Sequence, residues 1–439
     1  MSALVRFFLA NGKSVAGYDR TATPLTTQLI REGANIHYKE DLRLIPPEFL
    51  DSQSTLVIYT PAIPNAHAEW TYFRENGFEI MKRSQVLGLL TKHGKGLCVA
   101  GTHGKTTTST MVAHLLNQSH VGCNAFLGGI SQNYKTNLLL SSQSPYVVIE
   151  ADEYDRSFHW LTPYISVVTA TDADHLDVYG DKASYLEGFA HYTSLISPDG
   201  ALIVHEGLEL EPRLQSGTRC YTYSREKGDF HATNIRVGNG EIVFDFISPF
   251  GNIPNVQLGV PVLVNIENGI AAMAMAQICG AYPEEIRTAM ASFRGVERRF
   301  DFKVKTDKLV LLSDYAHHPE ELRQSILSMR ALFEGRKLTG IFQPHLYTRT
   351  RDFYHEFADS LSLLDEVILI DIYPAREKPI EGVTSRLIYD NLRPEVEKSM
   401  CSKHDLLPFL STKSFDVVMT LGAGDLDDLV PEICTILTT

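Results

Sequence analysis

The segment Leu97–Leu116, "LCVAGTHGKTTTSTMVAHLL", has the layout of a phosphate-binding loop. The apolar run over 96–100 is expected to form a buried parallel strand, and residues 107–116 have the spacing of a helix. The turn between them is shorter than the standard G-x-x-x-x-G-K-[ST] loop, because Val99 stands where the first glycine would be. A strand, a glycine-rich turn and a helix N-terminus in this order predict an anion site.

The polar residues of this turn have separate expected roles. Backbone N–H groups at the helix start point at phosphate oxygens, and Lys105 is expected to neutralise the β- and γ-phosphates. The hydroxyl of Thr106 is expected to hold a Mg²⁺ ion. An ordinary glycine-rich turn is the alternative, which the register of strand, glycines, lysine and helix disfavours. The predicted nucleotide loop consists of Gly101, Thr102, His103, Gly104, Lys105, Thr106 and Thr107.

The composition excludes several classes of protein. The 439 residues, 44% of them hydrophobic, suffice for two or three domains. A net charge of −13 argues against nucleic acid as the main partner, while a phosphate ligand needs only local cations. Six scattered cysteines without a C-x-x-C pair suit a reducing compartment. With no apolar run of eighteen residues and no signal-peptide pattern, we expect a soluble cytoplasmic protein without a membrane partner.

Helical and strand-like segments alternate along most of the chain, which predicts three consecutive α/β domains with mainly parallel sheets. The expected domains are a Rossmann-like N-terminal domain over 1–92, a P-loop ATPase-like central domain over 93–296 and a Rossmann-like C-terminal domain over 297–439. Three short alternating runs, "RCYTYS", "FHATNIRV" and "EIVFDFIS", predict a small antiparallel extension of the central domain.

Two acidic clusters follow apolar strands of the central domain. In an open parallel sheet, ligands bind outside the carboxyl ends of the strands. Carboxylates and a histidine beside a phosphate loop could therefore hold metal ions on ATP, and oxygen ligands suit Mg²⁺. Either cluster alone would be interpreted as acidic residues of a solvent-exposed turn. Their occurrence together with the phosphate loop favours a metal site instead. The clusters are Glu150, Asp152, Glu153 and Asp155, and Asp172, Asp174, His175 and Asp177.

Six ordered motifs together resemble the Mur ligases of peptidoglycan synthesis. They are "AGTHGKTTT", "EADEYD", "DADHLD", "GVERRFD", "DYAHHPEE" and "FQPHLYTRTRD". The resemblance covers nearly the whole chain and is strongest to the alanine-adding branch. It also accounts for the short loop, since this family uses G-T-x-G-K-T-T.

The resemblance implies an ATP-dependent amide ligase. Such an enzyme joins L-alanine to the lactyl carboxylate of UDP-N-acetylmuramate through an acyl phosphate. Lys105 would hold the β- and γ-phosphates, Thr106 and Glu150 one Mg²⁺, and His175 a second; Lys105, Glu150 and His175 would be the catalytic set.

The resemblance also assigns residues to the three substrates. Asn265 and Asn268 would contact adenine, and Arg299 and Asp314 would reach the nucleotide from the third domain. Tyr315, His317, His345 and Arg349 would form the amino-acid pocket, with Arg349 the partner of the alanine carboxylate. Asp19, Thr60 and His103 would lie in the UDP-sugar site.

The chain departs from the family pattern at several positions. Val264 replaces the histidine that usually precedes the adenine-site asparagines, and Leu346 stands where relatives commonly carry arginine. No lysine that could be carbamylated follows the "DH" motif at the distance seen in other branches. The sequence begins at "MSALVRFF", inside a motif of the type "GIGGIGMSAL", so we expect a shortened form of a longer ligase.

Some alternatives stay open on the sequence. His317 and His318 precede a helix and could cap it. Arg298 and Arg299 could be linker charges, and "LGAGD" could serve packing. The chain could instead be the ligase that recycles murein tripeptide, or a truncated nucleotide-binding protein without ligase activity. We expect a monomer or a homodimer.

Overall fold

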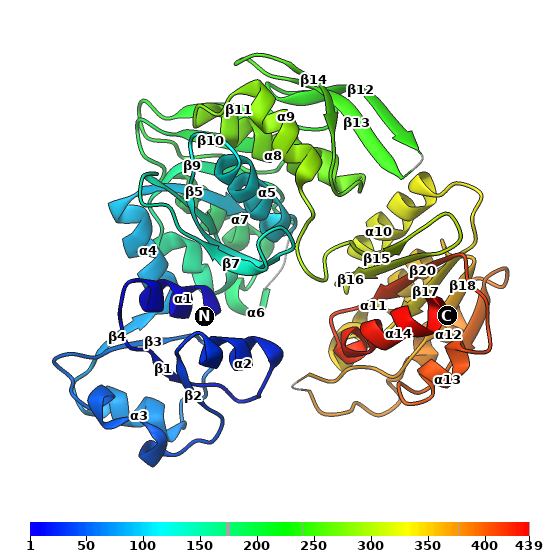
Figure 1. Cartoon of the computed structure of the whole chain (residues 1–439), viewed down its shortest axis with the longest axis horizontal. Coiled ribbons are helices and arrows are strands. Elements are labelled where there is room, and N and C mark those ends of the chain that lie inside the picture. The colour runs from blue at the N-terminus through cyan, green and yellow to red at the C-terminus, as the bar shows by residue number, and fades with distance from the viewer. Residues whose placement is uncertain (173–175, 239, 376, 439) are drawn as a thin grey trace. The chain divides into compact units, whose positions relative to one another are not determined.

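The computed structural model describes residues 1–172, 176–238, 240–375 and 377–438. These residues form two compact units (Figure 1). The first unit contains Met1–His231, Ser248–Phe250 and Ile270–Ala289, and the second contains Ala232–Ile247, Gly251–Gly269 and Met290–Thr439. The fold is three-domain α/β with mostly parallel sheets, as the sequence predicted, while the exact domain boundaries stay a prediction.

The N-terminal domain contains two parallel strand pairs and helices that carry apolar stripes. β1 pairs with β2 and β3 with β4. Among the described residues the two pairs are separate sheets, whereas the sequence predicted a single doubly wound sheet and missed β2. The elements are α1 (Ser2–Ala10), β1 (Ala16–Tyr18), α2 (Pro24–Arg31), β2 (Asn35–His37), β3 (Leu56–Tyr59), α3 (Ala68–Glu75), β4 (Glu79–Lys82) and α4 (Arg83–His93).

A seven-stranded sheet in the order β11-β10-β9-β5-β8-β6-β7 forms the centre of the first unit. All neighbours are parallel except the β6–β7 pair. The phosphate loop follows β5, which lies between β8 and β9. The strands are β5 (Lys95–Ala100), β6 (Asn124–Ser131), β7 (Thr136–Leu139), β8 (Tyr146–Glu150), β9 (Pro163–Val168), β10 (Ala201–His205) and β11 (Arg219–Tyr223).

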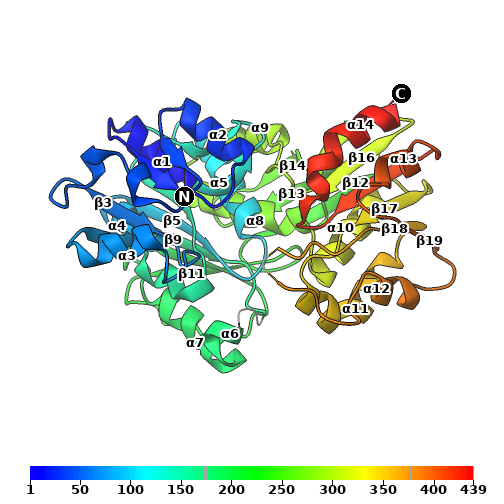
Figure 2. The ribbon, with the colours of Figure 1, turned by 90° about the horizontal axis from the view of Figure 1, so that it is seen from below.

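Helices bury their apolar faces against this sheet because its strands are apolar on both sides. α5 is buried almost throughout. α1 contacts β7, where Arg6 donates a hydrogen bond of 2.7 Å to Asn137 (Figure 1). Figure 2 shows α6 and α7 next to each other, and the rings of Tyr179 and Tyr185 meet edge to face between them. The helices are α5 (Lys105–Asn117), α6 (Leu176–Tyr179), α7 (Lys182–Thr193), α8 (Val264–Ile278) and α9 (Pro283–Ser292).

The predicted antiparallel extension is correct for two of its three runs. β12 (His231–Gly238), β13 (Glu241–Ile247) and β14 (Ile253–Gln257) form a three-stranded sheet. The assignment of "RCYTYS" to it is wrong, because these residues are β11, which pairs in parallel with β10. β11 is the edge strand of the seven-stranded sheet, and its burial increases along the strand from the exposed Arg219 to the buried Tyr223.

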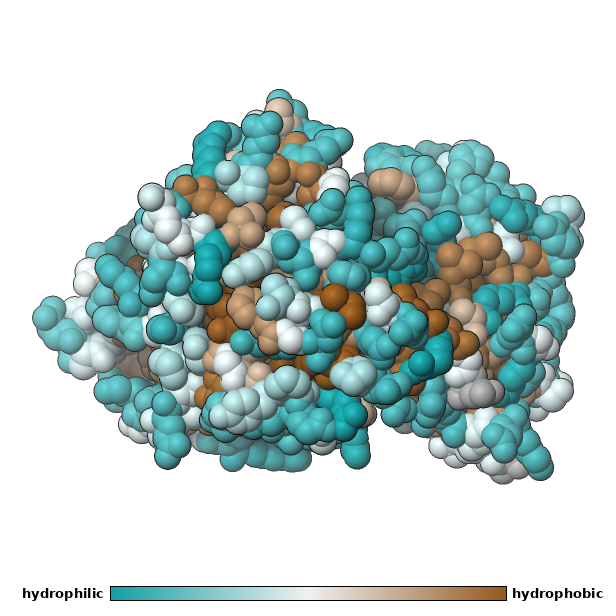
Figure 3. All heavy atoms as spheres, turned by 90° about the horizontal axis from the view of Figure 1, so that it is seen from above, coloured by the Kyte–Doolittle hydropathy of each residue, from teal (hydrophilic) through white to brown (hydrophobic). Residues whose placement is uncertain are grey.

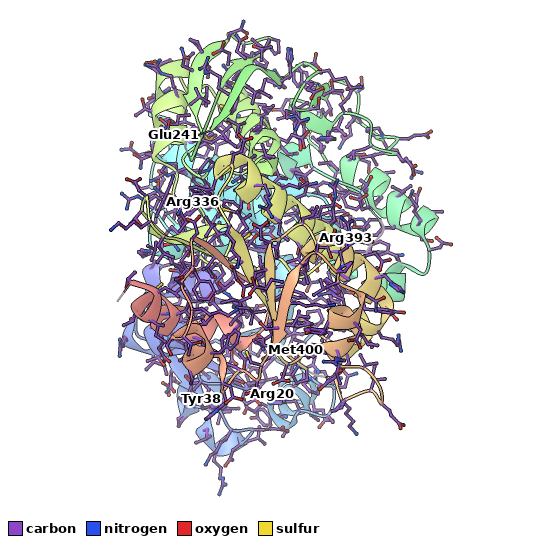
Figure 4. The ribbon with its side chains drawn as sticks, turned by 90° about the vertical axis from the view of Figure 1, so that its right-hand side faces the viewer. Arg20, Tyr38, Glu241, Arg336, Arg393 and Met400 are labelled. Atoms are coloured by element: carbon purple, nitrogen blue, oxygen red, sulfur yellow. The ribbon has the colours of Figure 1, made fainter. Side chains whose placement is uncertain are left out.

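The C-terminal domain contains a six-stranded sheet in the order β15-β16-β20-β17-β18-β19, parallel except at β15. Figure 4 places Arg336, which precedes β17, and Met400, which ends β19, at opposite ends of this sheet. The elements are β15 (Asp301–Lys305), β16 (Val310–Asp314), α10 (Pro319–Leu332), β17 (Leu338–Phe342), α11 (Tyr347–Leu361), β18 (Glu366–Leu369), α12 (Arg386–Asn391), β19 (Glu397–Met400), α13 (Leu406–Leu410), β20 (Val417–Leu421) and α14 (Val430–Thr438).

The face of the molecule that Figure 3 draws is mainly polar. On the face drawn in Figure 3, hydrophilic side chains cover most of the area and apolar ones form smaller patches. Within the described ranges, every helix is too short or too polar to cross a bilayer.

Candidate active site

The phosphate loop is braced by the strand beside it. Thr169, just after β9, donates its hydroxyl to the carbonyl oxygen of His103 at 2.5 Å, and Thr102 donates its N–H to Ala170 at 3.1 Å. Position 101 requires glycine for two reasons. A Cβ there would lie 2.2 Å from Oγ1 of Thr169, and the φ of Gly101 is +130°. The predicted loop is therefore a fixed turn that opens α5 at Lys105.

Lys105 is held inside the loop by oxygen atoms. Its ammonium donates to the carbonyl oxygen of Gly101 at 2.7 Å and to Oε1 of Glu153 at 2.8 Å. The Glu153 side chain is 1% exposed and that of Lys105 14% exposed. Burial raises the pKa of the Glu153 carboxyl, while the nearby Lys105 charge acts in the opposite direction.

Thr106 and Glu150, the two residues expected to hold one Mg²⁺ ion, lie next to each other. The Thr106 hydroxyl donates to Oε2 of Glu150 at 2.9 Å and to Oε1 at 3.1 Å. Thr106 lies in the first turn of α5, and Glu150 ends β8, which neighbours β5. The site thus offers a hydroxyl and a carboxylate, the oxygen ligands that Mg²⁺ prefers.

The second acidic cluster begins at the end of β9. Asp172 accepts a hydrogen bond of 2.8 Å from the Thr102 hydroxyl at its backbone oxygen, and its carboxylate lies 3.9 Å from Nε2 of His103. His175, which is predicted to bind a second Mg²⁺ ion, and Asp174 lie outside the described residues. The side chain of Asp177 does so too.

The four residues assigned to the amino-acid pocket gather at the carboxyl ends of parallel strands. Tyr315 and His317 follow β16, with ring centroids 5.2 Å apart, and His345 follows β17 with its ring 6.0 Å from that of His317. Arg349 lies one helical turn later in α11. Tyr373, which the sequence did not single out, stacks on His345 at 5.8 Å.

Two polar atoms of this cluster are buried without a hydrogen-bond partner among the described residues: Nδ1 of His345 and one terminal nitrogen of Arg349. Burial, with a smaller electrostatic contribution from the neighbouring His317 and Arg349, lowers the pKa of His345 to about 4. The ring is therefore neutral near pH 7. The unsatisfied guanidinium nitrogen can donate a hydrogen bond to a carboxylate. The neutral imidazole beside it can accept a hydrogen bond from an amine.

The four other nucleotide-site candidates all lie in the second unit. Asn268 donates to the side-chain oxygen of Asn265 at 3.0 Å, and both are buried. Asp314 accepts from the Ser325 hydroxyl at 2.6 Å and from a backbone N–H, and desolvation raises its pKa. Arg299 lies 5.1 Å over the ring of Tyr315.

The alternative roles at the start of α10 and in the linker also have structural counterparts. His318 is the N-cap of α10, so the capping prediction is confirmed for this residue. Arg298 binds Asp427 at 3.0 Å, in the turn after "LGAGD". Both residues thus have local structural partners.

The N-terminal domain borders a cavity of about 330 Å³. Its wall includes Tyr59, Trp70, Lys82 and Asp155. Thr60 lies between two lining residues in the chain, whereas Asp19, the other candidate of this domain, is not part of the lining.

Comparison with known proteins decides the family. Three family models match consecutive parts of the chain: "Mur ligase family, catalytic domain" over residues 1–95, "Mur ligase middle domain" over 99–276 and "Mur ligase, glutamate ligase domain" over 298–424. The chain belongs to the Mur ligase family. This Mur ligase is 71% identical over 437 residues to a UDP-N-acetylmuramate–L-alanine ligase of Phocaeicola vulgatus, covering 100% of this chain and 95% of the relative.

Further relatives of this Mur ligase agree with that match. A protein of the same name from Parabacteroides distasonis is 59% identical over 438 residues, with the same coverage of both chains. The crystal structure of a UDP-N-acetylmuramate–alanine ligase from Thermotoga maritima is 26% identical, with a TM-score of 0.81 and coverage of 99% and 96%. A murein peptide ligase from Psychrobacter arcticus has a TM-score of 0.67 at 20% identity, which shows the shared fold alone.

Sequence reasoning missed one glycine of this Mur ligase. Gly128 lies on β6 beside the end of β8, and a Cβ at this position would lie 2.1 Å from Oε2 of Glu150. Because Gly128 has no side chain, the Glu150 carboxylate can occupy the space next to β6. The paired glycines 128 and 129 inside a strand were the available signal, because glycine in a strand interior often marks a close approach.

Proposed function

We propose that this chain is a UDP-N-acetylmuramate–L-alanine ligase, which uses ATP to attach L-alanine to the lactyl carboxylate of UDP-N-acetylmuramate in cytoplasmic peptidoglycan precursor synthesis. The observation that carries the proposal is 71% identity, over the full length of this chain, to a relative of that name. Its phosphate loop and its buried arginine–histidine pocket supply residues for a nucleotide and for an amino acid.

The reaction proceeds in two displacement steps. The lactyl carboxylate attacks the γ-phosphorus of ATP, ADP leaves and an acyl phosphate forms. The alanine amine, after losing a proton, attacks the acyl carbon, and inorganic phosphate leaves as the amide forms. No side-chain nucleophile is required, so the protein contributes positioning and charge neutralisation.

The loop residues would hold the transferred phosphoryl group. Lys105 and the N–H groups at the start of α5 would bind the β- and γ-phosphate oxygens. Thr106 and Glu150 would hold Mg²⁺, which when bound neutralises phosphate charge. The fit rests on the adjacent hydroxyl and carboxylate and on the space that Gly128 leaves for Glu150. We assign His175 as a ligand of a second Mg²⁺ ion.

The amino-acid pocket would bind alanine through opposite ends of the molecule. Arg349 offers a buried, unpartnered guanidinium nitrogen to the carboxylate. The neutral His345 ring can accept a hydrogen bond from the amine at Nδ1. Tyr315 and His317 complete the wall.

The remaining assignments follow the domain order. Asn265 and Asn268 would contact adenine, and Arg299 and Asp314 the rest of the nucleotide. The N-terminal domain, with Asp19 and Thr60, would bind the UDP-sugar together with His103. We place the boundaries after residues 92 and 296, and we expect a monomer or a homodimer.

A coupled phosphate-release assay tests the proposal. Release is expected only when ATP, Mg²⁺, UDP-N-acetylmuramate and L-alanine are all present. A panel that also contains glycine, L-serine and murein tripeptide measures the specificity. Faster turnover with the tripeptide than with L-alanine would contradict the assignment, as would release that needs no amino acid.

A further inference from the structure

A short turn after β8 connects two binding regions of the first unit. We call residues Glu153–Arg156 the acidic turn. At its start, Glu153 holds the ammonium of Lys105 in the phosphate loop. Two residues later, Oδ2 of Asp155 lies 2.8 Å from Nζ of Lys82, the last residue of β4. Lys82 and Asp155 both line the cavity of about 330 Å³ at the N-terminal domain.

The backbone of the acidic turn is strained. Asp155 and Arg156 have φ values of 51° and 53°, in the left-handed region. This conformation is unfavourable for a residue other than glycine, and aspartate tolerates it better than arginine. A strained turn persists only while surrounding contacts hold it.

Contacts from three directions hold this turn. The Tyr179 hydroxyl donates to the backbone oxygen of Glu153 at 2.6 Å, and the Arg156 guanidinium lies 5.1 Å over the Tyr179 ring. The third contact is the Lys82–Asp155 ion pair, which comes from the N-terminal domain. Loss of this ion pair would remove the charged contact that the N-terminal domain makes with Asp155.

The Lys105–Glu153 pair opposes nucleotide binding in the conformation seen here. A γ-phosphate needs the Lys105 ammonium, but a carboxylate already occupies it at 2.8 Å and would repel the phosphate. Lys105 cannot leave Glu153 without cost, because the Glu153 side chain is 1% exposed and would lose a charged partner at 2.8 Å. Transfer of Lys105 to a nucleotide is therefore easiest when the turn that carries Glu153 moves as well.

We propose that the acidic turn couples the two substrate sites, with Glu153 and Asp155 as positioning residues. An anionic group of the sugar nucleotide in the cavity competes with Asp155 for Lys82, the turn relaxes, and Glu153 releases Lys105 to the ATP phosphates. The inference rests on the proposed function, since it takes UDP-N-acetylmuramate as the occupant of the cavity. Because coupling is reciprocal, ATP must raise the affinity for UDP-N-acetylmuramate by the same factor.

Binding measurements without turnover test this coupling. The Kd of a non-hydrolysable ATP analogue with Mg²⁺ is measured by calorimetry, with and without saturating UDP-N-acetylmuramate and in the absence of alanine. In the wild type the sugar nucleotide is expected to lower this Kd at least fivefold, within the usual range of coupling. Asp155→Asn keeps the side-chain size and the tolerance for a left-handed backbone but removes the charge.

Asp155→Asn is expected to bind the analogue alone about as tightly as the wild type does with the sugar nucleotide, with a remaining dependence below twofold. Glu153→Gln, at the other end of the turn, should show the same tight binding of the analogue without the sugar nucleotide. The two variants test the coupling independently, so misfolding of one of them would not prevent the test. Glu187→Gln is the matched control: it cuts an exposed ion pair with Arg213 in the same unit and should keep the wild-type coupling.

Two outcomes would overturn the inference: a wild-type Kd that does not depend on the sugar nucleotide, or full dependence in both variants. The ligase assay separates this inference from the proposed function. Product formation without coupling contradicts the acidic-turn proposal alone. Coupling without amide formation contradicts the proposed function and leaves the coupling standing.

Discussion

The hydroxyl of Thr106 and the carboxylate of Glu150 lie 2.9 Å apart, although 43 residues separate them in the chain. The contact exists because β5 and β8 are parallel neighbours, so the start of α5 and the end of β8 meet at one edge of the sheet. Gly128 on the next strand leaves room for the carboxylate.

Replacement of Glu150 should remove an oxygen ligand without disturbing the sheet. We expect Glu150→Gln to lower turnover about 10²-fold and to raise the Mg²⁺ concentration needed for half-maximal activity. A Mg²⁺ titration of the ligase reaction measures this. Glu284→Gln, at an exposed ion pair on α9, is the control; an unchanged Mg²⁺ requirement in Glu150→Gln would remove Glu150 from the metal site.

Gly128→Ala should affect the same carboxylate indirectly. The new Cβ would lie 2.1 Å from Oε2 of Glu150, so the side chain must turn away from Thr106. We expect a loss of activity close to that of Glu150→Gln, and a double variant little worse than either single one, because the two changes act on one group. Independent, multiplying losses would show that Gly128 serves another purpose.

Lys105→Ala should abolish ligation while the fold is kept. Removal of one positive charge from the transferring phosphoryl group typically costs about 10²-fold or more in rate. Circular dichroism and the thermal unfolding midpoint establish that the variant is folded. A variant with more than about half of the wild-type turnover would contradict the assigned role.

Arg349→Ala should act on one substrate alone. Loss of one partner of a buried charged pair costs roughly 2–5 kcal/mol, so the KM for L-alanine should rise strongly and that for ATP should stay nearly constant. Arg351→Ala is the matched control on the same helix, because Arg351 is exposed and pairs with Asp352. An unaltered KM for alanine would move the carboxylate site elsewhere, with His345 the next candidate.

His114 should make the protein sensitive to acid. The ring is 2% exposed and bonds to the Tyr134 hydroxyl and the Ala289 carbonyl oxygen. Burial lowers its pKa from 6.5 to about 4. The unfolded chain therefore binds this proton first, and stability is lost as the pH falls from about 6.5 to about 4, by about 3 kcal/mol at most.

Urea unfolding of the wild type and of His114→Gln between pH 4 and pH 7 measures how much of the pH-dependent free energy of unfolding comes from His114. The variant should lose less stability over the interval, because it lacks the titrating ring. Parallel pH profiles for the two proteins would show that His114 does not contribute.

The sequence predicted best what short-range patterns determine. The phosphate loop, Lys105 and Thr106 were found because their spacing reports a strand, a turn and a helix within twenty residues. The rule on strand ends predicted carboxylates beside the phosphate loop, and the resemblance to the Mur ligases predicted the pairing of Glu150 with Thr106. Gly128 escaped, since its role depends on a neighbour 22 residues away across the sheet.

The errors have physical causes. β11 was assigned to the antiparallel sheet because its short run of mixed polar and apolar residues does not show which way the neighbouring strand runs, and the neighbour β10 is parallel to it. The short strand β2 (Asn35–His37) has too few residues to show a period. The Lys105–Glu153 pair was missed because a charge run gives no sign of which member will be buried.

The position of β5 between β8 and β9 has a consequence for synthesis on the ribosome. A nascent chain that ends before residue 163 already contains the whole phosphate loop and Glu150, yet it lacks Thr169 and Ala170, whose hydrogen bonds hold His103 and Thr102. Pairing of β5 with β9 joins residues that are 67 or 68 positions apart in the chain, and such non-local contacts form late in folding. Nucleotide affinity should therefore appear abruptly once β9 has emerged, so that ATP can stabilise only chains whose central sheet is already assembled.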